Sequence, residues 1–134
     1  MSRPSWSGGA ALALAAGLLL SGAAMAQGPW VAPELDKAKK SPLPPGAKVV
    51  ADGKKLAQIN CVTCHGPGGK GDGAAAAALN PKPADWTSAR VQSESDGELF
   101  WKISNGRGAM PAWKLILPEN ERWALIQYIR SLKK

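Results

Sequence analysis

The residues with the most distinctive chemistry in this chain are Cys61, Cys64 and His65, which occur as Cys-Val-Thr-Cys-His. Cys-x-x-Cys-His is the attachment motif of a c-type haem. Because only two residues separate the thiols, one turn of helix can present both sulfurs to the two vinyl groups along one porphyrin edge. The histidine that follows then lies under the iron and supplies the proximal imidazole ligand. The motif therefore predicts one covalently bound haem c with its iron.

Three other uses of a Cys-x-x-Cys pair fit this sequence less well. A thioredoxin-like redox pair follows a strand in a βαβ pattern, and no such pattern is visible here. A zinc site usually needs four Cys or His ligands, whereas the chain has two cysteines and one histidine. A structural disulfide would explain neither the adjacent histidine nor the glycine-rich segment that follows it.

Residues 1–26 have the three parts of a secretory signal. Arg3 provides a basic start, residues 10–20 are apolar, and Ala-Met-Ala at residues 24–26 has the small-x-small form of a cleavage site. The alternative is an uncleaved membrane anchor, but the apolar run is short for a membrane span. We therefore expect cleavage after Ala26 and export of the mature protein.

The mature chain is short enough for one domain, residues 47–134, preceded by an arm. Residues 27–46 contain five of the eleven prolines, a density that regular helix or sheet does not tolerate. We expect an extended arm with at most one helical turn, near residues 34–40. The sequence leaves open whether this arm lies on the domain or tethers it to another protein.

Helical periodicity recurs in the domain, whereas no strand pattern appears, so an all-α fold is expected. Three helices are expected. The first begins near residues 47–52 and runs into the haem motif, the second begins at a Ser95 to Glu98 capping box, and the third begins at Pro118. Gly53 costs the first of these about 1 kcal/mol relative to Ala, and close approach of a second helix would explain it. The glycine-rich residues 66–73 indicate a loop that turns tightly or lies against something flat; a phosphate-binding loop is excluded by the missing GK[ST] and preceding strand.

Composition narrows the choice of the second axial ligand. His65 is the only histidine, and the three methionines are Met1, Met25 and Met110. The first two leave with the signal, so Met110 is the methionine that remains. It lies in a loop with glycines and a proline rather than on an apolar stripe, where methionine is usually core filler. We expect His65 and Met110 to bind the iron from opposite faces, with a lysine as the alternative to Met110.

The order of these features resembles the class I cytochrome c family over residues 47–134. The features are Cys-Val-Thr-Cys-His-Gly, the glycine-rich loop, a proline-rich wall, Asn-Gly-Arg-Gly, Ala-Met-Pro-Ala-Trp and a last helix with Tyr-Ile-Arg-Ser-Leu. The run from Gly-Asp-Gly to Pro-Lys-Pro-Ala-Asp-Trp is similar to bacterial monohaem domains. The resemblance implies a small helical cytochrome c fold wrapped around one haem, whose first and last helices cross closely.

Three contacts follow from the resemblance rather than from the residues alone. Gly53 should meet Leu125 or Tyr128 where the two helices cross. A backbone carbonyl of the proline-rich wall, from Pro81 or Pro83, should orient His65 through its second ring nitrogen. The haem motif and the methionine loop should border the exposed haem edge, where electrons leave.

The resemblance and the signal together imply a periplasmic one-electron carrier, with no catalytic residue and no small-molecule substrate. Two alternatives stay open: a haem subunit fixed to a larger oxidoreductase through the arm, and a haem enzyme or sensor in which Met110 leaves the iron. Membrane association is expected only through a partner or an uncleaved signal.

The charge of the chain bears on its partners. Its 17 Lys and Arg exceed its 10 Asp and Glu, for a net charge of +7, and loss of Arg3 with the signal changes this by one. A basic exported protein without a recognition helix or stacking sheet is not expected to bind nucleic acid. We expect redox partner proteins with acidic docking faces, met by basic residues beside the haem motif and Met110: Lys54, Lys55, Lys70, Arg107 and Lys114. The alternative is a generally solvated, lysine-rich surface.

Overall fold

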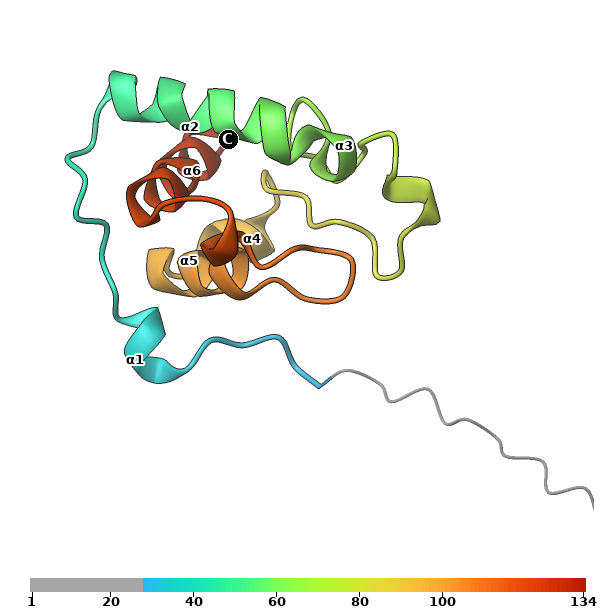
Figure 1. Ribbon diagram of the computed structural model, residues 1–134, viewed down its shortest axis with the longest axis horizontal. Coiled ribbons are helices and arrows are strands. Elements are labelled where there is room, and N and C mark those ends of the chain that lie inside the picture. The colour runs from blue at the N-terminus through green and yellow to red at the C-terminus, as the bar shows by residue number, and fades with distance from the viewer. Residues whose placement is uncertain (1–27) are drawn as a thin grey trace, which may run out of the picture.

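The computed structural model describes residues 28–134, and the expected signal with its cleavage site lies outside them. The described part is helical (Figure 1), with no strand in it beyond an isolated bridge between Arg107 and Met110. Six α-helices occur in it, namely α1 (Glu34–Lys37), α2 (Ala47–Asn60), α3 (Val62–His65), α4 (Ala89–Ser93), α5 (Asp96–Asn105) and α6 (Glu119–Ser131). Two 3₁₀ turns, η1 (Ala76–Ala78) and η2 (Trp113–Leu115), lie between them. The expected all-α fold is confirmed.

Helices α2 and α6 cross at close range, and Gly53 of α2 makes this crossing possible (Figure 1). A Cβ atom at Gly53 would overlap the backbone carbonyl of Ala124 and lie 3.0 Å from the Cβ atom of Tyr128. Of the two residues expected to meet Gly53, Tyr128 does so, together with the backbone of Ala124. Glycine therefore lowers the helix propensity of α2 but allows the two helices to pack closely.

We expect Gly53→Ala to lower the free energy of unfolding by about 1–3 kcal/mol, the usual cost of overpacking. The new methyl group would meet a backbone carbonyl of α6, which cannot rotate aside as a flexible side chain can. Thermal unfolding should be compared with that of Gly68→Ala, where an added Cβ comes no closer than 3.9 Å to Lys70. Equal unfolding midpoints for the two variants would contradict this account of the crossing.

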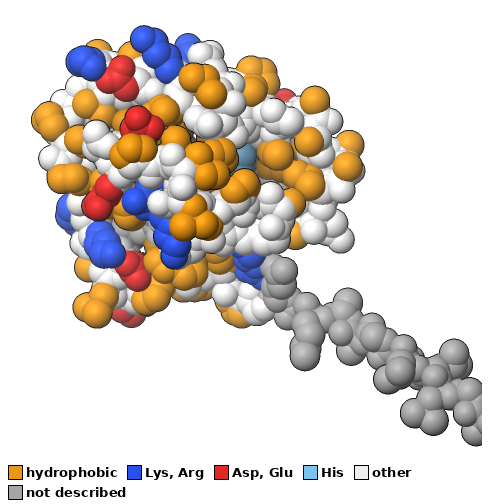
Figure 2. Space-filling model, in the orientation of Figure 1, with side chains coloured by type: hydrophobic (Ala, Val, Ile, Leu, Met, Phe, Trp, Pro, Cys, Tyr) orange, Lys and Arg blue, Asp and Glu red, His pale blue; other side chains and the backbone are white. Residues whose placement is uncertain are grey.

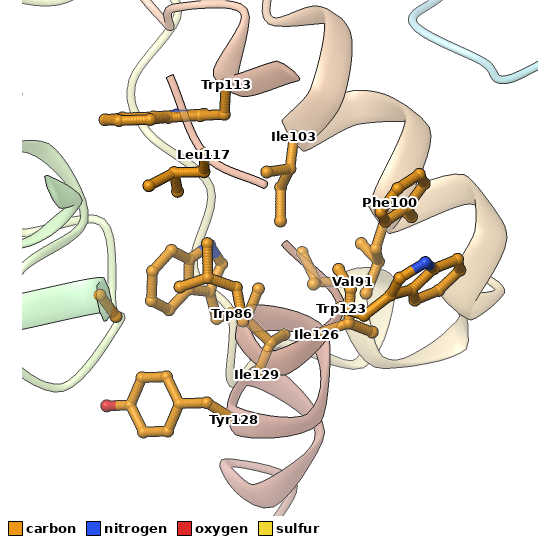
Figure 3. Packing of buried hydrophobic residues seen from close by; sticks show 13 residues of the cluster. Trp86, Val91, Phe100, Ile103, Trp113, Leu117, Trp123, Ile126, Tyr128 and Ile129 are labelled. Carbon is orange, nitrogen blue, oxygen red and sulfur yellow. The ribbon is translucent and has the colours of Figure 1, made fainter. Parts of the chain in front are cut away.

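The hydrophobic core is formed by side chains of α5 and α6 together with Trp86, Val91 of α4, Trp113 of η2 and Leu117 (Figure 3). The largest fully buried side chains all belong to α6: Trp123, Leu125, Ile126 and Ile129. Phe100 of α5 stacks on Trp123 with ring centroids 4.0 Å apart and an interplanar angle of 9°. The apolar stripe of α6 thus packs directly against the apolar face of α5.

Helix α4 is an element that the sequence analysis did not predict. Ser88 caps its first turn by accepting a hydrogen bond from the Val91 N–H. Arg130 of α6 ties this region to the last helix, because it donates to the Asp96 carboxylate at 2.7 Å and to the carbonyls of Val91, Gln92 and Glu94. The next helix, α5, begins as expected with Ser95 as its N-cap.

The described residues of the arm lie on the domain. Its single helical turn is α1, within the range expected for one. The Ser95 hydroxyl donates to the Lys37 carbonyl at 2.8 Å, and the backbone of α1 packs against Gly97 of α5. Ala32 of the arm is only 3% exposed. The arm therefore packs as part of the domain along α5.

Candidate functional site

The haem motif occupies the junction of α2 and α3. Cys61 ends α2 and begins the next turn, and its carbonyl accepts hydrogen bonds from the N–H groups of Cys64 (3.2 Å) and His65 (2.8 Å). One helical turn therefore holds the three side chains together. Both thiols are free and partly buried, so the pair is not a disulfide in this structure.

A backbone carbonyl fixes the orientation of the His65 imidazole. Nδ1 of His65 lies 3.0 Å from the carbonyl oxygen of Ala84. Since a carbonyl can only accept, Nδ1 carries the proton and Nε2 keeps its lone pair for a metal. The expectation that Pro81 or Pro83 supplies this carbonyl is wrong, because the next residue, Ala84, supplies it, while the Pro83 carbonyl lies against Gly71.

Trp86 supports the other side of the histidine. Its ring stacks on that of His65, with centroids 4.5 Å apart and an interplanar angle of 23°, and meets Tyr128 of α6 edge-on at 6.3 Å. Gln92 Nε2 donates to the carbonyls of Trp86 (2.7 Å) and Ile129 (2.9 Å), which ties this segment to α6. Figure 2 shows the single histidine of the chain in a recess among hydrophobic side chains.

The glycine-rich loop lies against the ring of Trp86, a flat surface of the kind that the sequence predicted. Gly69 has φ +70°, and a Cβ atom there would lie 2.6 Å from Cε3 of Trp86. The Trp86 N–H donates to the Gly69 carbonyl at 2.7 Å. Only a residue without a side chain fits here, so the loop and the tryptophan together form a wall beside His65.

Burial sets the protonation of the motif. It raises the pKa of the Cys61 thiol to about 11, with a smaller contribution from the neighbouring Cys64. Burial also lowers the pKa of His65, because the imidazolium is poorly solvated there, while the hydrogen bond to the Ala84 carbonyl partly opposes this. The imidazole is therefore neutral at neutral pH, as a metal ligand must be.

Met110 lies in the loop between α5 and η2, and backbone hydrogen bonds close this loop. The N–H groups of Arg107 and Met110 each donate to the carbonyl of the other residue at 3.0 Å. Met110 is half-buried and packs against the hydrophobic core cluster, as do Cys61 and Ala84. In Figure 1 this loop (orange) and α3 lie at the same end of the molecule, with residues 80–86 (yellow) between them.

The chemistry of these groups fits a haem c. The chain offers two free thiols on one helical turn, a neutral imidazole with an available Nε2, and a thioether on a separate loop packed against the same cluster. Figure 3 shows aromatic and aliphatic side chains, among them Trp113, Leu117, Trp86 and Tyr128, one after another along one side of that cluster. Cys61 and Cys64 would hold the porphyrin, and His65 and Met110 would ligate its iron.

The basic residues expected to form a docking face have different surroundings. Lys54, Lys55, Lys70 and Lys114 are exposed, and Lys114 donates to the Asn105 side chain at 2.8 Å. Arg107 is half-buried and engages the arm, because its Nη2 donates to the Gly28 carbonyl at 2.8 Å. Four of the five cations are thus presented to solvent, while the fifth has a structural contact.

Comparison with known proteins places residues 48–129 in a defined family. They match the family model described as cytochrome C oxidase, cbb3-type, subunit III. Because the match covers more than half of the chain, this protein belongs to that family of cytochrome c domains. The resemblance to class I c-type cytochromes is confirmed, and the family implies covalently bound haem c with its iron.

Individual relatives show the same domain in different contexts. The chain is 37% identical over 83 residues to the Cbb3-type cytochrome c oxidase subunit FixP of Bradyrhizobium diazoefficiens, which is 61% of this chain and 27% of FixP. It is 32% identical over 90 residues to cytochrome c6 of Cladophora glomerata, covering 62% of this chain and 88% of that protein. The chain therefore spans about a quarter of FixP but most of cytochrome c6.

Solved structures also match. The Kuenenia stuttgartiensis reducing HAO-like protein complex Kustc0457/Kustc0458 contains a chain with a TM-score of 0.62 and 29% identity, covering 69% of this chain and 47% of that one. The KustC0563 c-type cytochrome matches with a TM-score of 0.52 and 31% identity, over 62% of this chain and 99% of that one. Proteins similar to this chain thus include an oxidase subunit and a chain of a larger protein complex. Among residues 28–134, no helix is long and apolar enough to cross a membrane.

Proposed function

We propose that the mature protein is a periplasmic one-electron carrier that holds one haem c, with His65 and Met110 as the axial ligands of its iron. The observation that carries this proposal is that both side chains border one hydrophobic cluster. His65 stacks on Trp86, a member of the cluster, and Met110 packs against the same cluster from a separate loop.

Each residue of the site has a separate role toward the proposed haem. A haem c bound here would supply one-electron exchange between Fe(II) and Fe(III). The hydrogen bond from Nδ1 to the Ala84 carbonyl orients the His65 ring so that Nε2 points away from that carbonyl. The stacked ring of Trp86 prevents the imidazole from tilting. The Met110 thioether would fill the sixth position, which excludes oxygen, peroxide and substrates, and it would raise the reduction potential.

Ligand binding tests this proposal against that of a haem enzyme or sensor. A carrier with both axial positions filled by the chain should resist carbon monoxide when reduced and should show a weak sulfur-to-iron charge-transfer band in the far red when oxidised. Rapid carbon monoxide binding by the wild type would favour an enzyme or sensor in which Met110 leaves the iron.

A second candidate function is supported by the relatives. FixP is described as an oxidase subunit, and the Kuenenia match is a chain of a protein complex. This chain would then act as a haem subunit of a larger oxidoreductase. The contacts of the arm with α5 argue against attachment through the arm. Size-exclusion chromatography of native periplasmic extract separates a carrier of about domain size from a subunit.

The exposed lysines predict the salt dependence of electron transfer. If Lys54, Lys55, Lys70 and Lys114 meet an acidic partner, the bimolecular rate constant should fall as ionic strength rises, because rim charges mainly set the association rate. We expect a fall of roughly tenfold between low and physiological salt. A rate that is constant or rises with salt would rule out an acidic partner.

A further inference from the structure

Arg107 connects the arm to the Met110 loop. Its backbone is paired with Met110 by the two 3.0 Å hydrogen bonds that close the loop. Its side chain reaches the arm, where Nη2 donates to the Gly28 carbonyl at 2.8 Å and the guanidinium carbon lies 5.9 Å from the centroid of the Trp30 ring. Displacement of Arg107 would therefore displace the backbone of Met110.

Trp30 in turn is held by a cation on α5. The Lys102 ammonium lies 5.7 Å from the centroid of the Trp30 ring. Lys102 forms ion pairs with Glu94 (2.8 Å) and Glu98 (3.0 Å), and all three side chains are only 12–14% exposed. Ion pairs with so little exposure are weakly screened by solvent, so Lys102 is a fixed point. The Trp30 ring thus contacts both the fixed cation of α5 and the cation of the Met110 loop.

The arm on the C-terminal side of Trp30 is also anchored. Ala32 is 3% exposed, and the Lys37 carbonyl accepts the Ser95 hydroxyl at 2.8 Å. The backbone carbonyls of Asp36 and Lys37 pack against Gly97 of α5. These contacts fix where the arm runs from Ala32 onward, so Trp30 lies next to an anchored part of the chain, beside Lys102.

We propose that Trp30 is a positioning residue that holds the Met110 loop closed through Arg107. The proposal rests on the proposed role of Met110 as an axial ligand. In this view the arm limits how often Met110 leaves the iron, although the arm contributes no ligand itself. Loss of the aromatic ring should raise the population of an open loop while leaving the core of α5 and α6 intact.

The holoprotein allows a direct test by amide hydrogen exchange of Met110, whose N–H is hydrogen-bonded to the Arg107 carbonyl. Trp30→Ala should accelerate this exchange by about tenfold. The affinity of the oxidised protein for added imidazole should rise by a similar factor, because imidazole binds only when Met110 has left. Val31→Ala is the matched control, since the neighbouring Val31 is 50% exposed, and it should change neither quantity.

Two further variants distinguish a local effect on the loop from a general loss of stability. Trp30→Leu keeps apolar bulk but lacks the aromatic face, so it should also open the loop, and it carries the test if Trp30→Ala fails to fold. Trp30→Phe keeps an aromatic face and should restore most of the protection. Far-UV circular dichroism should show the same thermal midpoint for Trp30→Leu and Trp30→Phe if the effect is local.

A double-mutant cycle decides whether Trp30 acts through Arg107. In an Arg107→Ala background, Trp30→Ala should change the Met110 amide exchange rate by less than about twofold, because the connection is already broken. An unchanged rate in Trp30→Ala alone, or an equal acceleration in both backgrounds, would overturn the proposal. If instead imidazole affinity is the same in wild type and Met110→Ala, the ligand assignment fails, while the exchange data still show whether Trp30 holds the loop.

Discussion

The double substitution Cys61→Ala with Cys64→Ala should yield a protein that loses all of its haem into acidified acetone, whereas the wild type keeps its colour. Acid protonates the imidazole and breaks the iron–ligand bonds, so only thioether bonds can retain haem in the denatured chain. The protein must come from a host that can export it and mature c-type haem. The readout is the fraction of haem absorbance in the precipitate, expected to fall from nearly all to nearly none.

The single variants are the controls for this prediction. In Cys61→Ala or Cys64→Ala, one thioether remains, so most of the haem that is incorporated should stay with the precipitated protein. Both thiols lie on one helical turn around the Cys61 carbonyl, so neither substitution changes the backbone that presents the other. Complete extraction of haem from the wild type would contradict covalent attachment through these cysteines.

Features that depend on spacing along the chain could be predicted from the sequence. The haem motif and the Ser95 cap each lie within one or two turns of helix, and local geometry dictates their roles. The single helical turn of the arm follows in the same way from the distribution of prolines. Such elements are determined by residues that are close in sequence, so they can be predicted from a single sequence. The close contact at Gly53 instead joins two helices that are distant in sequence, and it was expected from the resemblance to the cytochrome c family.

The contacts around His65 could not be predicted because they are formed by the backbone and by distant residues. Any residue can supply a carbonyl, so nothing in the side chain of Ala84 marks it as the acceptor for Nδ1. Gln92 bridges Trp86 and Ile129 across the fold, and an isolated glutamine in a polar segment has no distinguishing pattern. Helix α4 was missed although Ser88 is a common N-cap residue, because its helix is only five residues long.

Arg107 illustrates why charge alone does not define a docking face. Its position beside Met110 suggested a role in binding acidic partners, in common with the exposed lysines. The structure gives it contacts with Gly28 and Trp30, which lie far from it in sequence. A half-buried cation contributes less to partner attraction than an exposed one, so Lys114, which is exposed although it donates to Asn105, is the better probe of docking beside Met110.

Met110→Ala should change the function of the protein more than any other single substitution outside the haem motif. In the proposed ligation, loss of the thioether would leave the sixth position to water or a lysine, neither of which stabilises Fe(II) as sulfur does. Axial ligands set haem potentials over a range of about 0.8 V, so we expect the reduction potential to fall by roughly 0.1 V or more. The reduced variant should bind carbon monoxide, and the oxidised variant should lack the far-red band of the wild type.

Met110→His separates the two parts of this effect. A histidine at this position can fill the sixth position without supplying sulfur, so this variant should resist carbon monoxide and yet have a lowered potential and no far-red band. Ala109→Gly, at the exposed neighbouring position, is the control for loop flexibility alone and should keep the band. If Met110→Ala retained both the wild-type potential and the far-red band, Met110 would not be the ligand, and a lysine would become the residue to test.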